Sequence, residues 1–171
     1  MEKHEEMKYT LSKKLLISLF IYYMLILIGG CFCTIHIGYS LAEQTPQPIL
    51  LRKNFYISLS VSSMLCSVRY IKRLYKACIT ERIDTQSNSL KRIGNFVYFI
   101  SRPFFACVFS VVAIFCVLSG MFIVAGSLDY ILNEKFLYLC VIISAIIGFS
   151  VGKVLDKFEE ISIERIKNLK S

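Results

Sequence analysis

Cysteine and histidine are the residue types that most often hold metals or form disulfides, and the chain has seven cysteines and two histidines. The cysteines are dispersed along the chain as Cys31, Cys33, Cys66, Cys78, Cys107, Cys116 and Cys140. An odd, scattered set without a Cys-x-x-Cys pair or a nearby histidine indicates neither a zinc site nor a disulfide framework. We therefore expect no metal and no cofactor, and we interpret most of these cysteines as small apolar side chains in helices.

Acidic residues could act as general acids, bases or proton carriers, but all twelve lie outside the uncharged apolar stretches. A proton-coupled exporter needs a carboxylate inside the bilayer, so the sequence disfavours that class. The glycines form no phosphate-binding loop, and no Ser/His/Asp or Cys/His set has catalytic spacing. The sequence therefore predicts a protein that is not an enzyme.

Serines on one apolar stretch are candidates for a polar path. Ser60, Ser63 and Ser67 follow one another at steps of three and four residues, which places them on one face of a helix. Such a face could line a pore between copies of the chain. Serines in spanning helices also bond to carbonyls of their own helix or to a neighbouring helix, and both interpretations stay open.

The densest positive charge lies between positions 69 and 92. Its basic residues are Arg69, Lys72, Arg73, Lys76, Arg82, Lys91 and Arg92. A surface of this kind can contact anionic lipid or an acidic protein. Because no nucleic-acid-binding motif accompanies the charge, we expect no direct binding of nucleic acid.

Small residues recur at helical spacing in the last two apolar stretches. One stripe is Ser144, Gly148 and Gly152, and the other is Ala106, Ser110, Ala113 and Gly120. Small side chains let helix backbones approach closely in lipid, where no hydrophobic force draws helices together. These stripes therefore predict helix packing, either within one subunit or between subunits of an oligomer.

Helices must position all these residues, because the 171-residue chain is 56% hydrophobic and only 19% charged. A soluble domain could not cover such a composition with polar surface. Four stretches approach the ~20 residues that a helix needs to cross the bilayer. They are residues 15–37, 51–70, 103–125 and 136–155. The predicted fold is a single all-α membrane domain, a bundle of four transmembrane helices, with no room for a separate globular domain.

Basic residues set the expected orientation, since lysine and arginine remain on the cytoplasmic side of a membrane. Seventeen of the twenty fall in the amino-terminal tail, the second loop or the carboxyl-terminal tail. We therefore expect both termini and the long second loop in the cytoplasm.

Helical periodicity continues beyond the membrane on the cytoplasmic side. Residues 71–102 predict a helical hairpin with a polar turn, and residues 156–170 predict a helix that extends the last span. Pro103 is expected to kink or restart the third span. Together these extensions form a basic platform to which a soluble protein could dock.

The whole layout can be compared with known families. The basic loop before Ser-Arg-Pro-Phe-Phe at 101–105 and the glycine-striped last span running into Val-Gly-Lys-Val-Leu-Asp at 151–156 resemble the KwaA family, membrane proteins of the bacterial Kiwa anti-phage defence system. The resemblance implies a homo-oligomeric inner-membrane component that detects membrane disturbance and works with a cytoplasmic DNA-binding partner, KwaB.

Two hypotheses of function result. The first is a noncatalytic membrane subunit of a defence complex that forms homo-oligomers and docks a soluble cytoplasmic partner. The alternative is a small pore-forming protein of the holin or membrane-depolarising type, in which the serine face meets its copies around an axis.

Overall fold

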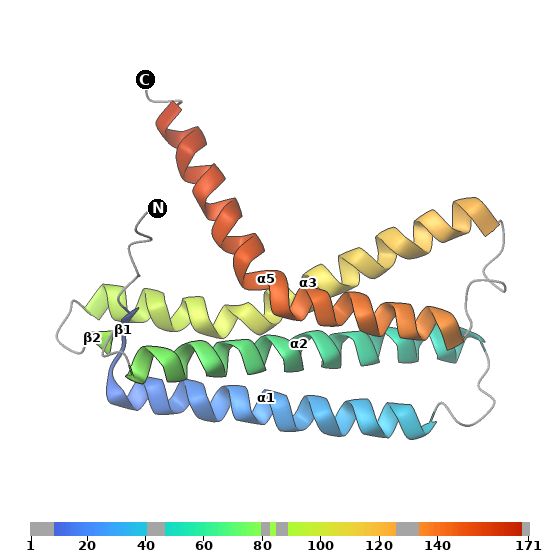
Figure 1. The fold of residues 1–171 in the computed structure, drawn as a ribbon, viewed down its shortest axis with the longest axis horizontal. Helices are drawn as coiled ribbons and strands as arrows, with labels where there is room; N and C mark the ends of the chain where they lie inside the picture. The colour runs from blue at the N-terminus through green and yellow to red at the C-terminus, as the bar shows by residue number, and fades with distance from the viewer. Residues whose placement is uncertain (1–8, 41–46, 80–82, 85–88, 126–133, 169–171) are drawn as a thin grey trace.

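Four long helices dominate the computed structural model, which describes residues 9–40, 47–79, 83–84, 89–125 and 134–168 (Figure 1). The helices are α1 (Lys13–Ser40), α2 (Gln47–Ile79), α3 (Ser89–Ala125) and α5 (Glu134–Asn168). Two short strands, β1 (Tyr9–Thr10) and β2 (Ile83–Asp84), complete the described elements. The prediction of a helical fold with four long helices is confirmed.

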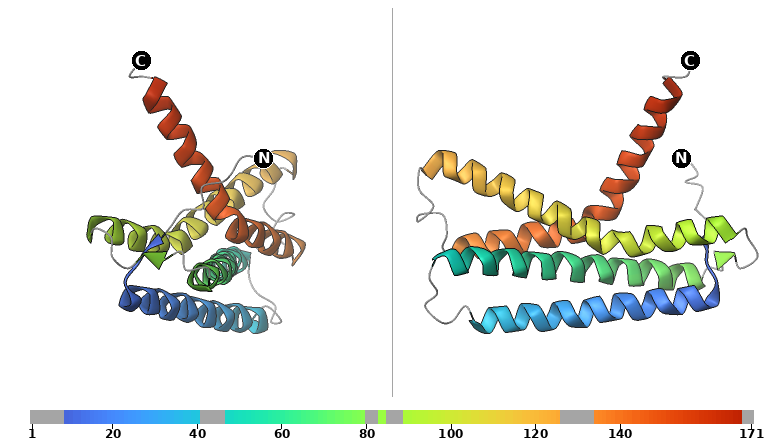
Figure 2. Two further views of the ribbon diagram at one scale, coloured as in Figure 1. Left: turned by 60° about the vertical axis from the view of Figure 1, so that its left-hand side comes forward. Right: turned by 180° about the vertical axis from the view of Figure 1, so that it is seen from behind.

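Helix α2 is the centre of the bundle and packs against each of the other three long helices. Figure 2 shows it between α1 on one side and α3 with α5 on the other. Its polar side chains Asn54, Ser58, Ser62 and Ser67 are completely buried. Hydroxyls can be buried at little cost here because they bond to the helix itself, as Ser58 does to the carbonyl of Asn54 at 2.7 Å.

Three of the four helices are long and apolar enough to cross a membrane, namely Lys13–Tyr39, Arg92–Met121 and Phe136–Lys157. Large apolar side chains such as Leu25, Phe104 and Ile146 are exposed on their outer faces. An apolar exterior of this extent is typical of a multi-pass membrane protein. The stretch 51–70 of α2, which the sequence predicts as a fourth span, does not meet the same criterion of composition.

A parallel strand pair, absent from the sequence-based prediction, joins the start of the chain to the connection between α2 and α3. Tyr9 lies opposite Ile83, and Thr10 lies opposite Asp84. A strand of two residues is too short to show the alternation of apolar and polar side chains by which strands are recognised in a sequence. The pair lies at the end of the bundle where α2 ends and α3 begins (Figure 1). The predicted polar turn of the helical hairpin, residues 85–89, lies outside the described part of the chain except for Ser89, which begins α3.

Two of the helices change direction along their length. The two halves of α3 point in different directions, and the C-terminal half of α5 leaves the bundle (Figures 1 and 2). Pro103 lies inside α3 and explains its bend, because proline removes a helix hydrogen bond and clashes with the preceding turn. In α5, Val151 and Gly152 are buried, and no side chain described after them is buried. The last span and the helix predicted after it are one continuous element.

Candidate functional site

A buried arginine lies where α2, α3 and α5 meet. Arg102 on α3 is only 3% exposed. Its Nη2 donates a hydrogen bond of 3.0 Å to Oδ1 of Asp156 on α5. Its guanidinium carbon lies 3.8 Å from the centroid of the Tyr98 ring. A buried charge is costly unless it is paired, and this arginine has both an ion pair and a cation–π contact.

Asp156 joins further groups to this arginine. Its Oδ1 also accepts a hydrogen bond of 3.0 Å from the hydroxyl of Tyr98, and its Oδ2 lies 3.9 Å from Nη1 of Arg73 on α2. The contact to Arg73 is weak, since its side chains are 30% and 43% exposed and water screens them. We call Tyr70, Arg73, Tyr98, Arg102 and Asp156 the junction cluster. It connects three helices at the position where α5 leaves the bundle.

Two tyrosines of α1 donate hydrogen bonds to backbone carbonyls at the bend of α3. Because Pro103 has no N–H group, the carbonyl of Phe99 four residues earlier has lost its helical donor. The hydroxyl of Tyr23, which is completely buried, donates to this carbonyl. The neighbouring Tyr22 donates to the carbonyl of Ile100 at 3.1 Å. Helix α1 therefore satisfies two acceptors at the kink.

Aromatic contacts connect these tyrosines to the junction cluster. The Tyr23 ring stacks on that of Tyr70, with centroids 6.0 Å apart and an interplanar angle of 9°. Tyr70 in turn meets Phe99 edge to face at 6.0 Å and 87°. Such pairs contribute about 0.5–1.5 kcal/mol each beyond the area they bury. One layer of rings thus connects α1, α2 and α3 at the same level of the bundle.

Two polar groups of the junction cluster are buried without a hydrogen-bond partner among the described residues. They are Nη1 of Arg102 and the hydroxyl of Tyr70. Gly152 of α5 lies against the Tyr70 hydroxyl, because a Cβ atom at this glycine would be only 2.6 Å from it. The same Cβ would be 3.5 Å from Cζ and Nη2 of Arg69. A side chain at position 152 would collide with the Tyr70 hydroxyl, so this contact requires glycine.

The small-residue stripes are largely used inside one chain. Ser110 of α3 and Ser144 of α5 share a buried hydrogen bond of 2.7 Å, and Ala106 is completely buried. A Cβ at Gly148 would be 2.6 Å from the backbone oxygen of Ser62 on α2. These contacts favour the packing of both stripes within the subunit. Only the far end of the α3 stripe faces outward: Ala113 is half-buried and Gly120 is exposed.

Replacing Gly148 by alanine is therefore expected to lower the free energy of unfolding by about 1–2 kcal/mol, because the methyl group collides with backbone that cannot move aside. Titration with sodium dodecyl sulfate in mixed micelles measures this loss. Gly120→Ala is the matched control, since nothing lies within 4 Å of its Cβ position. Equal stability of the two variants would contradict the close contact between α5 and α2.

The serines predicted to line a pore mostly form hydrogen bonds within their own helix. Ser63 donates to the carbonyl of Ser60 at 3.1 Å, and Ser67 donates to that of Ser63 at 2.8 Å. Ser67 is completely buried. The fully buried polar seam is instead Asn54, Ser58 and Ser62, whose four-residue spacing is also visible in the sequence. Composition alone could not decide which of the two faces points inward.

The basic run divides into an inner and an outer group. Lys72 and Lys76 are exposed on the last turns of α2, whereas Arg73 of the junction cluster and its neighbour Arg69 are half-buried. Arg92 is half-buried on α3. Arg82 and the side chain of Lys91 lie outside what the structure describes. The surface open to a partner is therefore smaller than the sequence indicates.

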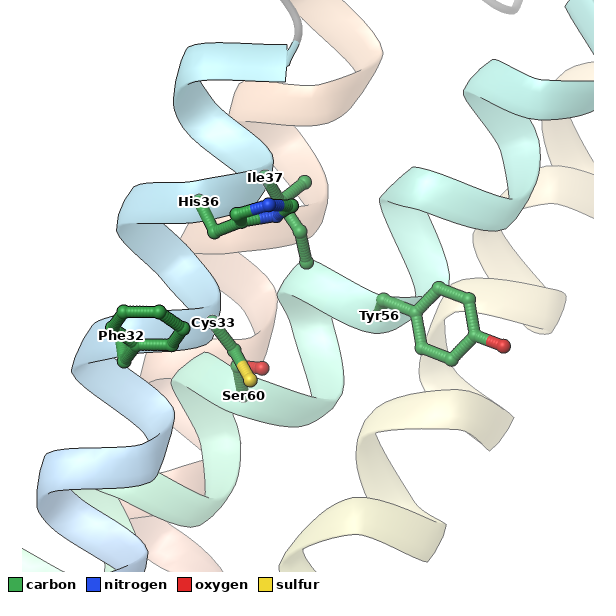
Figure 3. A pocket seen from close by; sticks show the side chains of 6 residues that line it. All are labelled: Phe32, Cys33, His36, Ile37, Tyr56 and Ser60. Atoms are coloured by element: carbon green, nitrogen blue, oxygen red, sulfur yellow. The ribbon is translucent and has the colours of Figure 1, made fainter.

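An open, mostly apolar groove lies between α1 and α2 at the opposite end of the bundle (Figure 3). Its volume is about 290 Å³, and its lining is Phe32, Cys33, His36, Ile37, Tyr56 and Ser60. The ring of His36 stacks on that of Phe32 with centroids 6.3 Å apart. His36, interpreted as interfacial from its position in the sequence, thus lies in a groove between two helices.

The described residues hold no group of three or more His, Cys, Asp or Glu side chains that could bind a metal. All seven cysteines are free thiols. Burial raises the pKa of the Cys78 thiol near the end of α2, so little of it is in the reactive thiolate form at neutral pH.

The sequence analysis missed the junction cluster as a site. Arg102 counts there as one of the basic residues that border a loop, and Asp156 as an acidic residue beyond the last span. The two are 54 positions apart, so only the fold brings them together. An arginine directly before a helix proline was the one local signal for it.

Comparison of the chain with protein-family models, with curated proteins and with solved structures finds no match in any of the three.

Proposed function

We propose that the chain is a noncatalytic multi-pass membrane subunit that presents its basic end to a soluble cytoplasmic protein. The observation that carries the proposal is the exposure of Lys72, Tyr75 and Lys76 at the end of α2. The C-terminal half of α5 projects from the same molecule and adds a second surface that the bundle does not cover (Figure 1). Exposed charge beside an exposed aromatic ring is suited to a protein interface.

The lengths of the helices support a membrane that covers the part of the bundle beyond the junction cluster. At 1.5 Å per residue, residues 103–125 of α3 span roughly 34 Å, residues 51–70 of α2 roughly 30 Å and residues 136–152 of α5 roughly 26 Å. These values agree with a hydrocarbon thickness of ~30 Å. The junction cluster then lies at one boundary, where tyrosine and arginine are common in membrane proteins.

In this arrangement α2 also crosses the membrane, in addition to the three apolar helices, so the chain has four spans. Its serines and Asn54 face the neighbouring helices, so it need not have a lipid-compatible composition on every side. Lys13, Lys14, Lys72 and Lys76 all belong to the junction side. By the positive-inside rule that side is cytoplasmic, and both termini lie there.

The resemblance to the KwaA family gives the proposal its biological setting. The subunit would be a homo-oligomer in the bacterial inner membrane and part of an anti-phage defence complex, and its soluble partner would be KwaB. Contact with nucleic acid would then belong to the partner. A pore lined by Ser60, Ser63 and Ser67 is the less favoured function, because Ser67 is buried and two of these hydroxyls bond to their own helix.

Reversal of the two exposed lysines is expected to reduce recovery of the partner at least tenfold. The double variant Lys72→Glu/Lys76→Glu is expressed with the soluble protein encoded beside it, and co-purification is measured. Arg73 is left unchanged because it contacts Asp156. The matched control is Lys13→Glu/Lys14→Glu, two exposed lysines at the start of α1.

Equal recovery with both double variants would show that docking does not depend on the end of α2. Loss of membrane potential on expression of the chain alone would favour the pore instead.

A further inference from the structure

The region around Gly152 carries more positive than negative charge. Arg69 of α2 borders Gly152, and Arg73 of α2 and Arg102 of α3 contact Asp156, which lies four residues after this glycine on α5. These four side chains together keep a net charge of +2. Lys153 and Lys157 of α5 are exposed on the adjoining surface and increase the positive potential further.

Two donors of this group of side chains are unused, and the guanidinium carbon of Arg102 lies 6.0 Å from the centroid of the Tyr70 ring. Nη1 of Arg102 and the hydroxyl of Tyr70 are buried without partners among the described residues, and both residues are almost completely buried. A buried polar group without a partner destabilises the fold, so a bound acceptor would recover free energy. The Tyr70 hydroxyl and the Arg69 guanidinium both border the position that a side chain at residue 152 would fill.

We infer that Arg69, Tyr70 and Arg102 form a binding site for a phosphate group. Guanidinium groups match the geometry of phosphate oxygens, and a tyrosine hydroxyl donates a further hydrogen bond. Asp156 holds one edge of the Arg102 guanidinium and leaves Nη1 for the ligand. Because α5 leaves the bundle after Gly152, the site lies beside the point where a ligand could enter.

An anionic phospholipid and free phosphate offer the same chemistry from two sources. The placement of the junction cluster at the cytoplasmic boundary, which rests on the proposed function, makes the lipid head group the nearer source. The binding measurement uses the purified full-length chain without a protein partner. Failure of docking to a soluble protein therefore leaves its result unaffected.

The test makes two measurements on the chain in zwitterionic detergent micelles. Native mass spectrometry measures whether the chain retains phosphatidylglycerol. Thermal unfolding measures whether inorganic phosphate protects the chain. Lipid retention without an effect of phosphate assigns the site to a lipid head group. Protection by phosphate alone assigns it to a soluble phosphate compound. If neither lipid retention nor protection by phosphate is observed, the inference is overturned.

Three variants make the test specific. Arg69→Gln and Tyr70→Phe are each expected to weaken binding about tenfold, while Lys72→Gln removes the same charge from an exposed position of α2 and is expected to change it less than twofold. Tyr70→Phe retains the ring that packs on Tyr23, so the fold is preserved. An equal loss in Arg69→Gln and Lys72→Gln would show diffuse attraction and would overturn the site.

Discussion

Replacement of Asp156 by alanine is expected to lower the free energy of unfolding by about 2–4 kcal/mol. The variant leaves the guanidinium of Arg102, which is 3% exposed, without its carboxylate acceptor. The loss of free energy is smaller than the largest values for a broken buried ion pair, because the Asp156 side chain is 43% exposed and water can reach the vacated space. Denaturing-detergent titration in mixed micelles measures the change.

The neighbouring exposed Lys157 supplies the control, since Lys157→Ala also removes one charge from α5. We expect that variant to stay within about 0.5 kcal/mol of the original chain. Adding Arg102→Met to Asp156→Ala should restore part of the lost stability, because no buried charge then lacks a partner. If Asp156→Ala and Lys157→Ala were equally stable, the ion pair would have no role in joining α3 to α5.

Tyr23→Phe is expected to destabilise the chain by about 2–3 kcal/mol, since a buried carbonyl that loses its donor has no water to replace it. The affected acceptor is the carbonyl of Phe99, which Pro103 has already deprived of a helix donor. The same titration reports the loss. Tyr22→Phe should cost less, because Tyr22 is only partly buried.

A double-mutant cycle separates this repair from simple packing. In a Pro103→Ala background the N–H of residue 103 can donate to Phe99 again, so Tyr23→Phe should then cost less than about 1 kcal/mol. The same cost in both backgrounds would mean that the hydroxyl does not compensate for the proline.

The four helices could be predicted from the sequence because each depends on a long local pattern. Uncharged runs over residues 15–37 and 103–125 are sufficient by themselves, and the bend of α3 follows from Pro103. The centrality of α2 could not be predicted, since it depends on which helices surround it. The same reason explains why the serines of α2 gave an ambiguous signal.

The candidate site was harder to predict because it depends on pairs distant in sequence. Periodicity placed Arg69 and Lys72 on one helix, but only packing decides that Arg69 borders Gly152 while Lys72 faces outward. Gly152 was predicted as a packing residue, and its neighbours Tyr70 and Arg69 come from another helix. Helical spacing defines faces, whereas the identity of the opposing face requires the fold.

The central claim is that α2 crosses the membrane as the fourth span, with the junction cluster at its cytoplasmic end. Labelling of single cysteines with a membrane-impermeant maleimide tests it, using Arg52→Cys or Lys76→Cys in a chain whose seven native cysteines are replaced. In intact cells we expect position 52 to react and position 76 to react only after the membrane is permeabilised. Reaction of both positions from the same side would contradict the four-span arrangement.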